Sequence, residues 1–278
     1  MLRLWVALFA FALIGAPALG AETVRPFVPG YWNTDTLPDK PDLSTLGAIR
    51  FVTTNDYPPF GFTLANGAAA GFDVDVARAL CNELKVTCTV QARRWDAIVP
   101  AVTSGQADAA IASLAIKDVP PGGLAFTGAY YRTPARFVVR SGTELPSVGP
   151  DALAGKRIGV VAGSAHQAYL RLFFPKAIGV AFASVEAVRA ALKSGAIDAA
   201  FGDGVTWATW LNGTDAANCC RFEGGAYTES RFFGRGAGIA VRATDETLRR
   251  ALDYALARIA AEGIYGDIYL KYFPLGLY

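Results

Sequence analysis

The chain has 278 residues, which is too long for one small domain and suits one large domain or two modest ones. Apolar residues make up 53% and charged residues 18% of it, so it can fill a sizeable core and is not disordered. Its net charge of +2 without a dense basic run argues against a dedicated nucleic-acid binder. One histidine and four cysteines, with no CxxC or HExxH spacing, argue against a zinc enzyme, and we expect no metal or other cofactor.

The first 20 residues have the pattern of a secretory signal peptide. Arg3 precedes an uncharged apolar stretch over residues 4–16, and Ala18 and Gly20 supply small residues at positions −3 and −1 of a cut after Gly20. The apolar run is short for a membrane span, although an uncleaved N-terminal anchor is the alternative. No cysteine follows the run, so we expect no lipid anchor. The sequence therefore predicts an exported protein that loses residues 1–20.

Export changes how the four cysteines are interpreted. Cys81 and Cys88 stand with six residues between them, at a predicted helix end and at the start of the next strand. A turn there brings the sulfurs within bonding reach, and an oxidising compartment keeps them joined, so we predict a disulfide; two buried free thiols are the alternative. For the adjacent Cys219 and Cys220, a vicinal disulfide, two free thiols and intermolecular pairing all remain open.

The chain then divides into an arm and an α/β region. Residues 21–45 are rich in proline and lack apolar periodicity, which is typical of an extended arm. From Ile49 the pattern alternates between a short apolar strand over 49–53, a helix over 72–84, a β-branched strand over 86–90 and a helix over 95–103. This order predicts a parallel sheet flanked by helices.

An internal near-repeat predicts two such units. Residues 104–113 (SGQADAAIAS) match residues 194–203 (SGAIDAAFGD), and each copy follows an amphipathic helix that stops at glycine. The units start near Ile49 and near Lys156. Residues 137–139 are expected to cross between them, and residues 238–241 are expected to return.

The predicted crossings give two lobes that are discontinuous in the sequence. We expect the first lobe to take residues 46–137 and 233–278, and the second lobe residues 138–232. Open α/β sheets bind ligands beyond the carboxyl ends of their strands. Ser113 and Asp203 stand at equivalent strand ends of the two repeats, so they are expected to face each other across a cleft.

Six stretches of the chain resemble a known family. They begin at Ile49 (IRFVT), Tyr57 (YPPF), Gly71 (GFDVDV), Trp95 (WDAIVP), Phe126 (FTGAYY) and Phe233 (FGRGAGIAV), and they occur in the order typical of periplasmic solute-binding proteins of family 3. The resemblance implies the type II periplasmic-binding-protein fold, an α/β structure whose two lobes each carry a parallel-dominated sheet and are joined by a hinge of two crossing strands. It also implies a periplasmic monomer that carries a polar amino acid or related amine to a membrane ABC permease. Some basic-amino-acid members have a disulfide where Cys81 and Cys88 stand.

The resemblance also assigns a ligand-binding set. Tyr57 matches an aromatic that stacks on the ligand, Trp95 a second wall, and Ser113 a polar contact at the first strand end. Asp203 matches a carboxylate that grips the ligand ammonium, and Ser164 lies in a turn that contacts the ligand carboxylate. The full predicted set is Tyr57, Trp95, Ser113, Leu114, Lys117, Ser164, His166 and Asp203. Three of these have simpler interpretations: Asp203 as a cap of the helix over 204–211, Trp95 as a core residue and Lys117 as a solvated lysine.

The largest departure from the family lies after Ser113. The family pattern S-[LM]-[ST]-I-T-x-x-R ends in an arginine that binds the ligand α-carboxylate through two hydrogen bonds, whereas this chain reads SLAIKDVP and ends in Pro120. Each charged hydrogen bond contributes about 1.5–3 kcal/mol, so the loss weakens carboxylate binding by several kcal/mol. Another cation substitutes, or the ligand lacks an α-carboxylate. The candidate cations are Lys117, His166, Arg132 and Arg94.

Three functions fit these observations. The first is a non-catalytic receptor that closes on an amino acid or related amine and delivers it to a permease. The second is a partner-binding accessory protein of an exported oxidoreductase, which the missing arginine permits. The third is an exported enzyme on the same fold that resembles cyclohexadienyl dehydratases, which needs a placed general acid. We expect the first.

Overall fold

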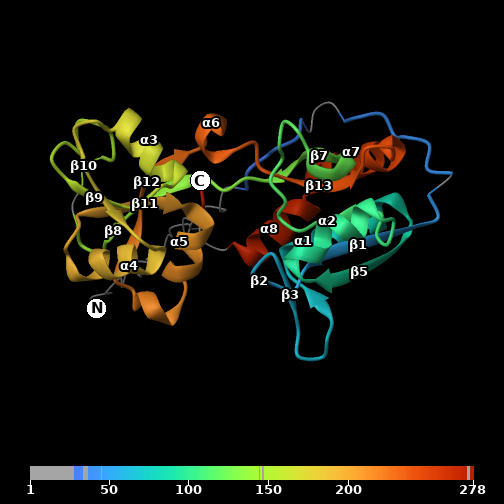
Figure 1. The fold of residues 1–278 in the computed structure, drawn as a ribbon, viewed down its shortest axis with the longest axis horizontal. Helices are drawn as coiled ribbons and strands as arrows, with labels where there is room; N and C mark the ends of the chain where they lie inside the picture. The colour runs from blue at the N-terminus through green and yellow to red at the C-terminus, as the bar shows by residue number, and fades with distance from the viewer. Residues whose placement is uncertain (1–27, 34–36, 45, 144, 146, 274–275) are drawn as a thin grey trace, which may run out of the picture.

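The structure is a computed structural model and describes residues 28–33, 37–44, 46–143, 145, 147–273 and 276–278. They form two lobes that lie side by side along the longest axis of the molecule, each built on one five-stranded sheet (Figure 1). The predicted signal peptide over residues 1–20 and the first part of the predicted arm lie outside the described residues. Among the described residues, no helix combines the length and apolar character needed to cross a bilayer.

The first lobe has the strand order β5-β1-β6-β13-β7. β1 pairs in parallel with β5 and β6, and β13 runs antiparallel to both of its neighbours. Four strands therefore run in one direction and only β13 opposes them. A small sheet, β2-β3-β4, lies beside this one. The strands are β1 (Ala48–Thr54), β2 (Asp56–Tyr57), β3 (Gly61–Thr63), β4 (Ala69–Ala70), β5 (Thr87–Arg93), β6 (Ala109–Ala110), β7 (Leu124–Tyr131) and β13 (Ala237–Arg242).

The second lobe repeats this plan with the order β10-β9-β11-β8-β12. Here β9 pairs in parallel with β10 and β11, and β8 is the one strand that opposes the others. The predicted α/β fold with parallel-dominated sheets is confirmed. The strands are β8 (Ala135–Arg140), β9 (Arg157–Val161), β10 (Ile178–Phe182), β11 (Ala199–Asp203) and β12 (Cys220–Tyr227).

The two opposing strands, β8 and β13, are those that enter each sheet from the other lobe. β8 lies in the second sheet from Ala135 onward, so Phe137, the expected last residue of the first lobe segment, is inside a second-lobe strand, where it pairs with Phe201. The crossing therefore lies a few residues earlier, between the end of β7 at Tyr131 and the start of β8 at Ala135. On the return, Gly236 has φ +102°, and a Cβ there would lie 2.6 Å from the carbonyl oxygen of Tyr131, so this position requires glycine.

Helices cover the sheets and bury their apolar faces. The first-lobe core joins α1, α7 and α8 to the sheet through residues such as Phe51, Phe72 and Leu256. The second-lobe core packs α3 against the sheet around Phe137 and Phe201. The helices are α1 (Phe72–Leu84), α2 (Trp95–Thr103), α3 (Ala165–Phe173), α4 (Val185–Ser194), α5 (Gly204–Leu211), α6 (Ser230–Phe233), α7 (Glu246–Ala261) and α8 (Ile264–Tyr272), with short 3₁₀ turns η1 (Pro121–Gly123) and η2 (Thr214–Ala216).

The two copies of the sequence repeat make matching side-chain hydrogen bonds. Arg50 of β1 donates to the carboxylate of Asp108 at 2.7 Å and to the carbonyl of Gly105 at 2.9 Å. Arg157 of β9 makes the matching bonds to Asp198 at 2.8 Å and to Gly195 at 3.1 Å. Each pair ties the start of β1 or β9 to the segment that enters the neighbouring strand, β6 or β11, so it fixes the register of the two.

All four cysteines form disulfides within the described residues. Cys81 and Cys88 are bonded, with their Cα atoms 6.2 Å apart, and join the end of α1 to β5 as predicted. Cys219 and Cys220 are bonded to each other at the start of β12. Of the three alternatives that the sequence left open for this pair, the structure shows the vicinal disulfide.

The described part of the arm packs on the first lobe and reaches the hinge. Trp32 lies edge-on to Tyr265 with ring centroids 4.9 Å apart. The Tyr31 hydroxyl accepts a hydrogen bond from the backbone N–H of Arg132 at 3.0 Å and lies 2.8 Å from the Tyr278 hydroxyl. Tyr278 in turn donates to the carbonyl of Arg132 at 3.0 Å. The arm and the C-terminal residues therefore both bind the backbone where the chain leaves β7 for β8.

This arrangement predicts that Tyr31→Phe lowers the free energy of unfolding by about 1 kcal/mol, because the backbone N–H of Arg132 loses its acceptor. Urea denaturation followed by circular dichroism measures the change. Tyr254→Phe is the matched control, since the Tyr254 hydroxyl has no hydrogen bond to the described residues. Equal stability of the two variants would contradict the proposed contribution of the arm.

Candidate functional site

Six of the eight predicted site residues line two cavities, one in each lobe, and Tyr57 and Ser164 line neither. Trp95, Ser113, Leu114 and Lys117 line a cavity of about 310 Å³ in the first lobe. His166 and Asp203 line a cavity of about 330 Å³ in the second lobe, together with Thr206. Ser113 and Asp203 stand at the carboxyl ends of β6 and β11, which are the equivalent strand ends of the two repeats. The structure thus forms two half-sites.

Asp203 uses one of its two carboxylate oxygens to cap α5. Its Oδ1 accepts hydrogen bonds from the backbone N–H and from the hydroxyl of Thr206, both at 2.8 Å. The simpler interpretation of Asp203 as a helix cap is therefore correct for this oxygen. Oδ2 has no hydrogen-bond partner among the described residues. Because an ionised carboxylate accepts at both oxygens, Asp203 can cap the helix and bind a cation at the same time.

His166 lies beside Asp203 near the start of α3. Its ring stacks on Phe233 with centroids 5.2 Å apart and lies edge-on to Phe201 at 5.8 Å. Burial lowers the pKa of His166 below 6.5, and the negative charge of Asp203 only partly opposes this effect. His166 is thus mainly neutral at pH 7, so it offers a flat aromatic face and a polar edge rather than a positive charge.

Tyr57 supplies an aromatic surface on the first lobe. Its side chain is 50% exposed, and its ring stacks on Phe60 at 5.2 Å, which in turn stacks on Tyr131 at 4.7 Å. Partial burial raises the pKa of Tyr57, and the charges of Asp203 and Asp73 raise it further. Tyr57 therefore lies in the negative fields of a second-lobe and a first-lobe carboxylate, which is a favourable environment for a cation.

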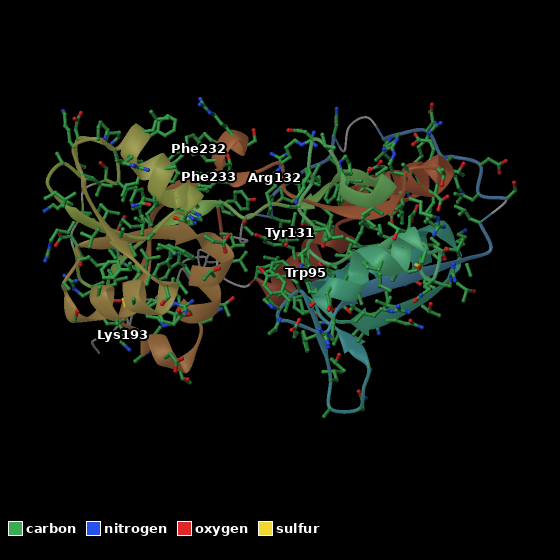
Figure 2. All side chains as sticks on the ribbon, in the orientation of Figure 1. Trp95, Tyr131, Arg132, Lys193, Phe232 and Phe233 are labelled. Atoms are coloured by element: carbon green, nitrogen blue, oxygen red, sulfur yellow. A yellow bond between two sulfur atoms is a disulfide. The ribbon has the colours of Figure 1, made fainter. Side chains whose placement is uncertain are left out.

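Trp95 and Lys117 are both exposed at the rim of the first-lobe cavity. Trp95 is 57% exposed, so its interpretation as a core residue is wrong. Figure 2 shows Trp95 and Tyr131 on the border of the first lobe that lies nearest the second. The Lys117 ammonium has no ion-pair or hydrogen-bond partner among the described residues, so it is available to an anionic group.

Ser164 is the N-cap of α3, and both of its hydrogen-bonding functions are occupied. Its hydroxyl donates to the carbonyl of Val161 at 2.7 Å and accepts from the backbone N–H of Gln167 at 3.1 Å. Contact between this hydroxyl and a ligand stays a prediction, and it requires one of the remaining lone pairs or an exchange of partners.

The sequence assigned no role to Asp73, which lies directly behind Ser113. Asp73 is fully buried near the start of α1. It accepts a hydrogen bond from the Tyr130 hydroxyl at 2.7 Å and one from the Ser113 hydroxyl at 3.2 Å. Burial raises the pKa of Asp73 to about 7, although these two bonds lower it in part. An acidic residue between the core residues Phe72 and Val74 was the only available sequence signal.

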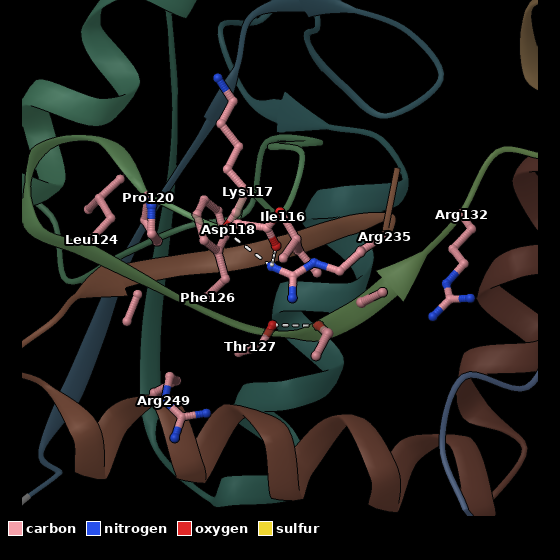
Figure 3. A pocket seen from close by; sticks show the side chains of 13 residues that line it. Ile116, Lys117, Asp118, Pro120, Leu124, Phe126, Thr127, Arg132, Arg235 and Arg249 are labelled. Carbon is pink, nitrogen blue, oxygen red and sulfur yellow. Dashed lines mark hydrogen bonds and ion pairs between the residues drawn. The ribbon is translucent and has the colours of Figure 1, made fainter. Parts of the chain in front are cut away.

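Four cations stand near Pro120, where the family has its arginine. Lys117, Arg132, Arg235 and Arg249 line a cavity of about 500 Å³ beside β7. Figure 3 shows Arg235 reaching Asp118 while the Lys117 side chain points away from both; the Arg235–Asp118 distance is 3.4 Å. Arg94 pairs with Asp96 at 2.9 Å, and Arg132 lies over the Tyr31 ring at 5.8 Å. Of the candidate cations, Lys117 alone lines the cavity of Ser113 and has no partner in the described chain.

Within the described ranges, no group of three histidine, cysteine, aspartate or glutamate side chains could hold a metal ion. The two cavities instead combine aromatic faces, one carboxylate oxygen, a hydroxyl and one exposed ammonium. These groups have the chemistry to hold a small polar molecule by hydrogen bonds and charge.

Comparison with known proteins gives a consistent result. The family model of bacterial extracellular solute-binding proteins, family 3, matches residues 49–275. The L-arginine-binding protein of Pseudomonas aeruginosa is 34% identical over 96% of this chain and 97% of its own. A putative ABC transporter arginine-binding protein 2 of Escherichia coli is 35% identical over 81% of this chain and 90% of its own. The solved L-cystine solute receptor of Neisseria gonorrhoeae, 17% identical, superposes with a TM-score of 0.71 over 83% of this chain and 94% of its own.

The divided use of Asp203 predicts different stabilities for two variants. Asp203→Asn retains a good capping oxygen, so the free energy of unfolding should change by less than about 0.5 kcal/mol. Asp203→Ala removes the cap and should cost about 1 kcal/mol. Thermal unfolding of the ligand-free variants measures both values. A loss in Asp203→Asn as large as that in Asp203→Ala would show that the charge, and not the cap, stabilises α5.

Proposed function

The chain belongs to the bacterial extracellular solute-binding proteins of family 3, and on that premise we propose that it binds a cationic amino acid, L-arginine, between its lobes. It then delivers the ligand to a membrane ABC permease. The relatives named for arginine binding in Pseudomonas aeruginosa and Escherichia coli support this choice of ligand.

The observation that carries the proposal is the free oxygen of Asp203. Thr206 fixes one oxygen of this carboxylate, and the other, which has no partner among the described residues, needs a donor. Burial raises the pKa of Tyr57 on the other lobe, and the charge of Asp203 raises it further. A ligand ammonium or guanidinium placed between them gains the charge of Asp203 and the face of the Tyr57 ring.

The ligand carboxylate requires a cation, and Lys117 is the best placed. Arg94 and Arg235 are held by Asp96 and Asp118, and His166 is mainly neutral. The Lys117 ammonium lies on a flexible stem at the rim of the first-lobe cavity, so it can move to a carboxylate when the lobes approach. A single lysine holds a carboxylate less rigidly than the two-bond arginine of the family does.

Binding is expected to couple to lobe closure. Each half-site holds only part of the set, since the two cavities are lined by different lobes. A ligand that touches both stabilises the closed form by its differential affinity for that form. The crossings near Pro134 and Gly236 are the segments about which the lobes would turn.

We place the protein in the periplasm as a monomer after removal of residues 1–20, as is typical of the family. The role is non-catalytic: the one histidine is stacked on Phe233 and its pKa is lowered, which suits ligand contact better than general acid catalysis.

Isothermal titration calorimetry with L-arginine tests the proposal. Asp203→Asn should weaken binding by about 2 kcal/mol or more, roughly 30-fold, because the ligand cation is desolvated without its counter-charge. Lys117→Ala should weaken it by about 1 kcal/mol, roughly fivefold, because this ammonium is exposed. Asp151→Asn, an exposed second-lobe aspartate paired with Lys176, is the matched control and should change nothing.

Three outcomes would contradict the proposal. Wild-type affinity in Asp203→Asn would show that the amine site is elsewhere. Failure of the wild type to bind L-arginine, L-lysine or L-histidine, together with capture of an oxidoreductase, would favour the accessory role. Turnover of a cyclohexadienyl acid would show the enzyme.

A further inference from the structure

Ser113 forms one wall of the first-lobe cavity, and the buried carboxylate of Asp73 lies directly behind it. We propose that Asp73 is a positioning residue that holds the Ser113 hydroxyl as a hydrogen-bond acceptor and thereby selects a cationic N–H group of the ligand at this wall. The inference rests on the proposed function and deepens it by assigning one wall of the site to one end of the ligand.

When Asp73 is ionised, the direction of the hydrogen bonds around it is determined. An ionised carboxylate only accepts, so the Tyr130 and Ser113 hydroxyls must both donate to it. The Tyr130 oxygen then accepts the backbone N–H of Ser113 at 3.0 Å. This closed set of three bonds holds Ser113 in its left-handed backbone conformation, with φ +57°.

The Ser113 hydroxyl has one proton, and it donates that proton to Asp73. Only the lone pairs of the Ser113 oxygen therefore remain for a ligand in the cavity that Ser113 lines. Lone pairs accept from an ammonium or a guanidinium and repel a carboxylate. When Asp73 is protonated it can donate to Ser113 instead, and the Ser113 proton becomes free to turn toward an anion. The protonation of Asp73 therefore reverses the preference of the wall.

The groups that face Asp73 are neutral. They are the phenols of Tyr130 and Tyr131 on β7, Tyr57 on β2 and Tyr265 on α8, together with the Ser113 hydroxyl. No cationic side chain of the described residues is among the causes that set the pKa of Asp73. Asp75, the other acid in the first turn of α1, pairs with Lys271 instead.

Ligand binding is therefore expected to change the protonation of Asp73. The folded-state pKa of Asp73, about 7, lies above its usual 3.8, and a ligand cation held by Ser113 favours the ionised form and lowers it again. Binding therefore releases a proton near neutral pH. Affinity for L-arginine should fall about tenfold between pH 8 and pH 6, the factor expected for one group with that pKa, while the ligand guanidinium stays charged.

The test is calorimetric titration of L-arginine at pH 7 in buffers with different ionisation enthalpies, which measures the protons released. Wild type should release about half a proton, since Asp73 is then about half protonated. Asp73→Asn keeps the shape of the side chain but cannot titrate, so it should release none and its affinity should not vary between pH 6 and pH 8. A loss of packing alone would lower affinity without removing this pH dependence.

Two matched variants keep the test specific. Ser113→Ala retains Asp73 but removes the link to the ligand, so its proton release should fall with that of Asp73→Asn. Asp151→Asn, an exposed second-lobe aspartate paired with Lys176, is the matched control, and it should retain the wild-type release at pH 7. Circular dichroism confirms that each variant is folded before titration.

The outcomes separate this inference from the proposed function. Arginine binding with full proton release in folded Asp73→Asn would overturn the inference and leave the function standing, as would wild-type binding without proton release. Absence of arginine binding by the wild type from pH 6 to pH 9 would overturn both.

Discussion

One ion pair occurs twice and holds in register the strands that Ser113 and Asp203 follow. In the first lobe Arg50 on β1 pairs with Asp108, which precedes the neighbouring strand β6, and in the second lobe Arg157 on β9 pairs with Asp198, which precedes β11. The guanidinium lowers the pKa of its partner in both cases, so each pair remains ionised at neutral pH. Because the pair sets the register between two parallel strands, it also sets where the second strand ends, and Ser113 and Asp203 follow those ends.

Ser113 and Asp203 occupy equivalent positions, but the hydrogen-bonding groups that the two lobes offer there are different. The second lobe presents a carboxylate that is half committed to a helix cap, with its other oxygen free. The first lobe presents a hydroxyl whose proton is directed inward by a buried carboxylate. Both devices leave acceptors facing the cleft, and Pro120 removes the usual donor. Under the proposed function, the site therefore favours a ligand with more donors than acceptors, a description that arginine fits.

The sequence was informative where the signal is local or repeated. Alternating apolar periods gave the strands and helices, and the match between residues 104–113 and 194–203 located Ser113 and Asp203 at equivalent strand ends. Cys81 and Cys88 were paired correctly because a short turn separates them. The half-exposed Tyr57 also agrees with its expected place outside the core.

The features that the sequence missed depend on contacts between distant segments. Asp73 meets Ser113 and Tyr130 only because α1 packs across the sheet, and Tyr31 meets Tyr278 across almost the whole chain. The strand boundary at Ala135 depends on pairing with β11 rather than on local composition. Ser164 was recognised as a polar loop residue, but its hydroxyl partner Val161 was not.

A crystal structure of the protein with L-arginine tests the central claim most directly, since the claim is that two half-sites become one when the lobes close. The account predicts one arginine that contacts the Asp203 carboxylate in the second lobe and the Ser113 hydroxyl oxygen in the first, with an N–H group of the ligand directed at each. An arginine bound to one lobe only, or one whose carboxylate faces Ser113, would contradict it.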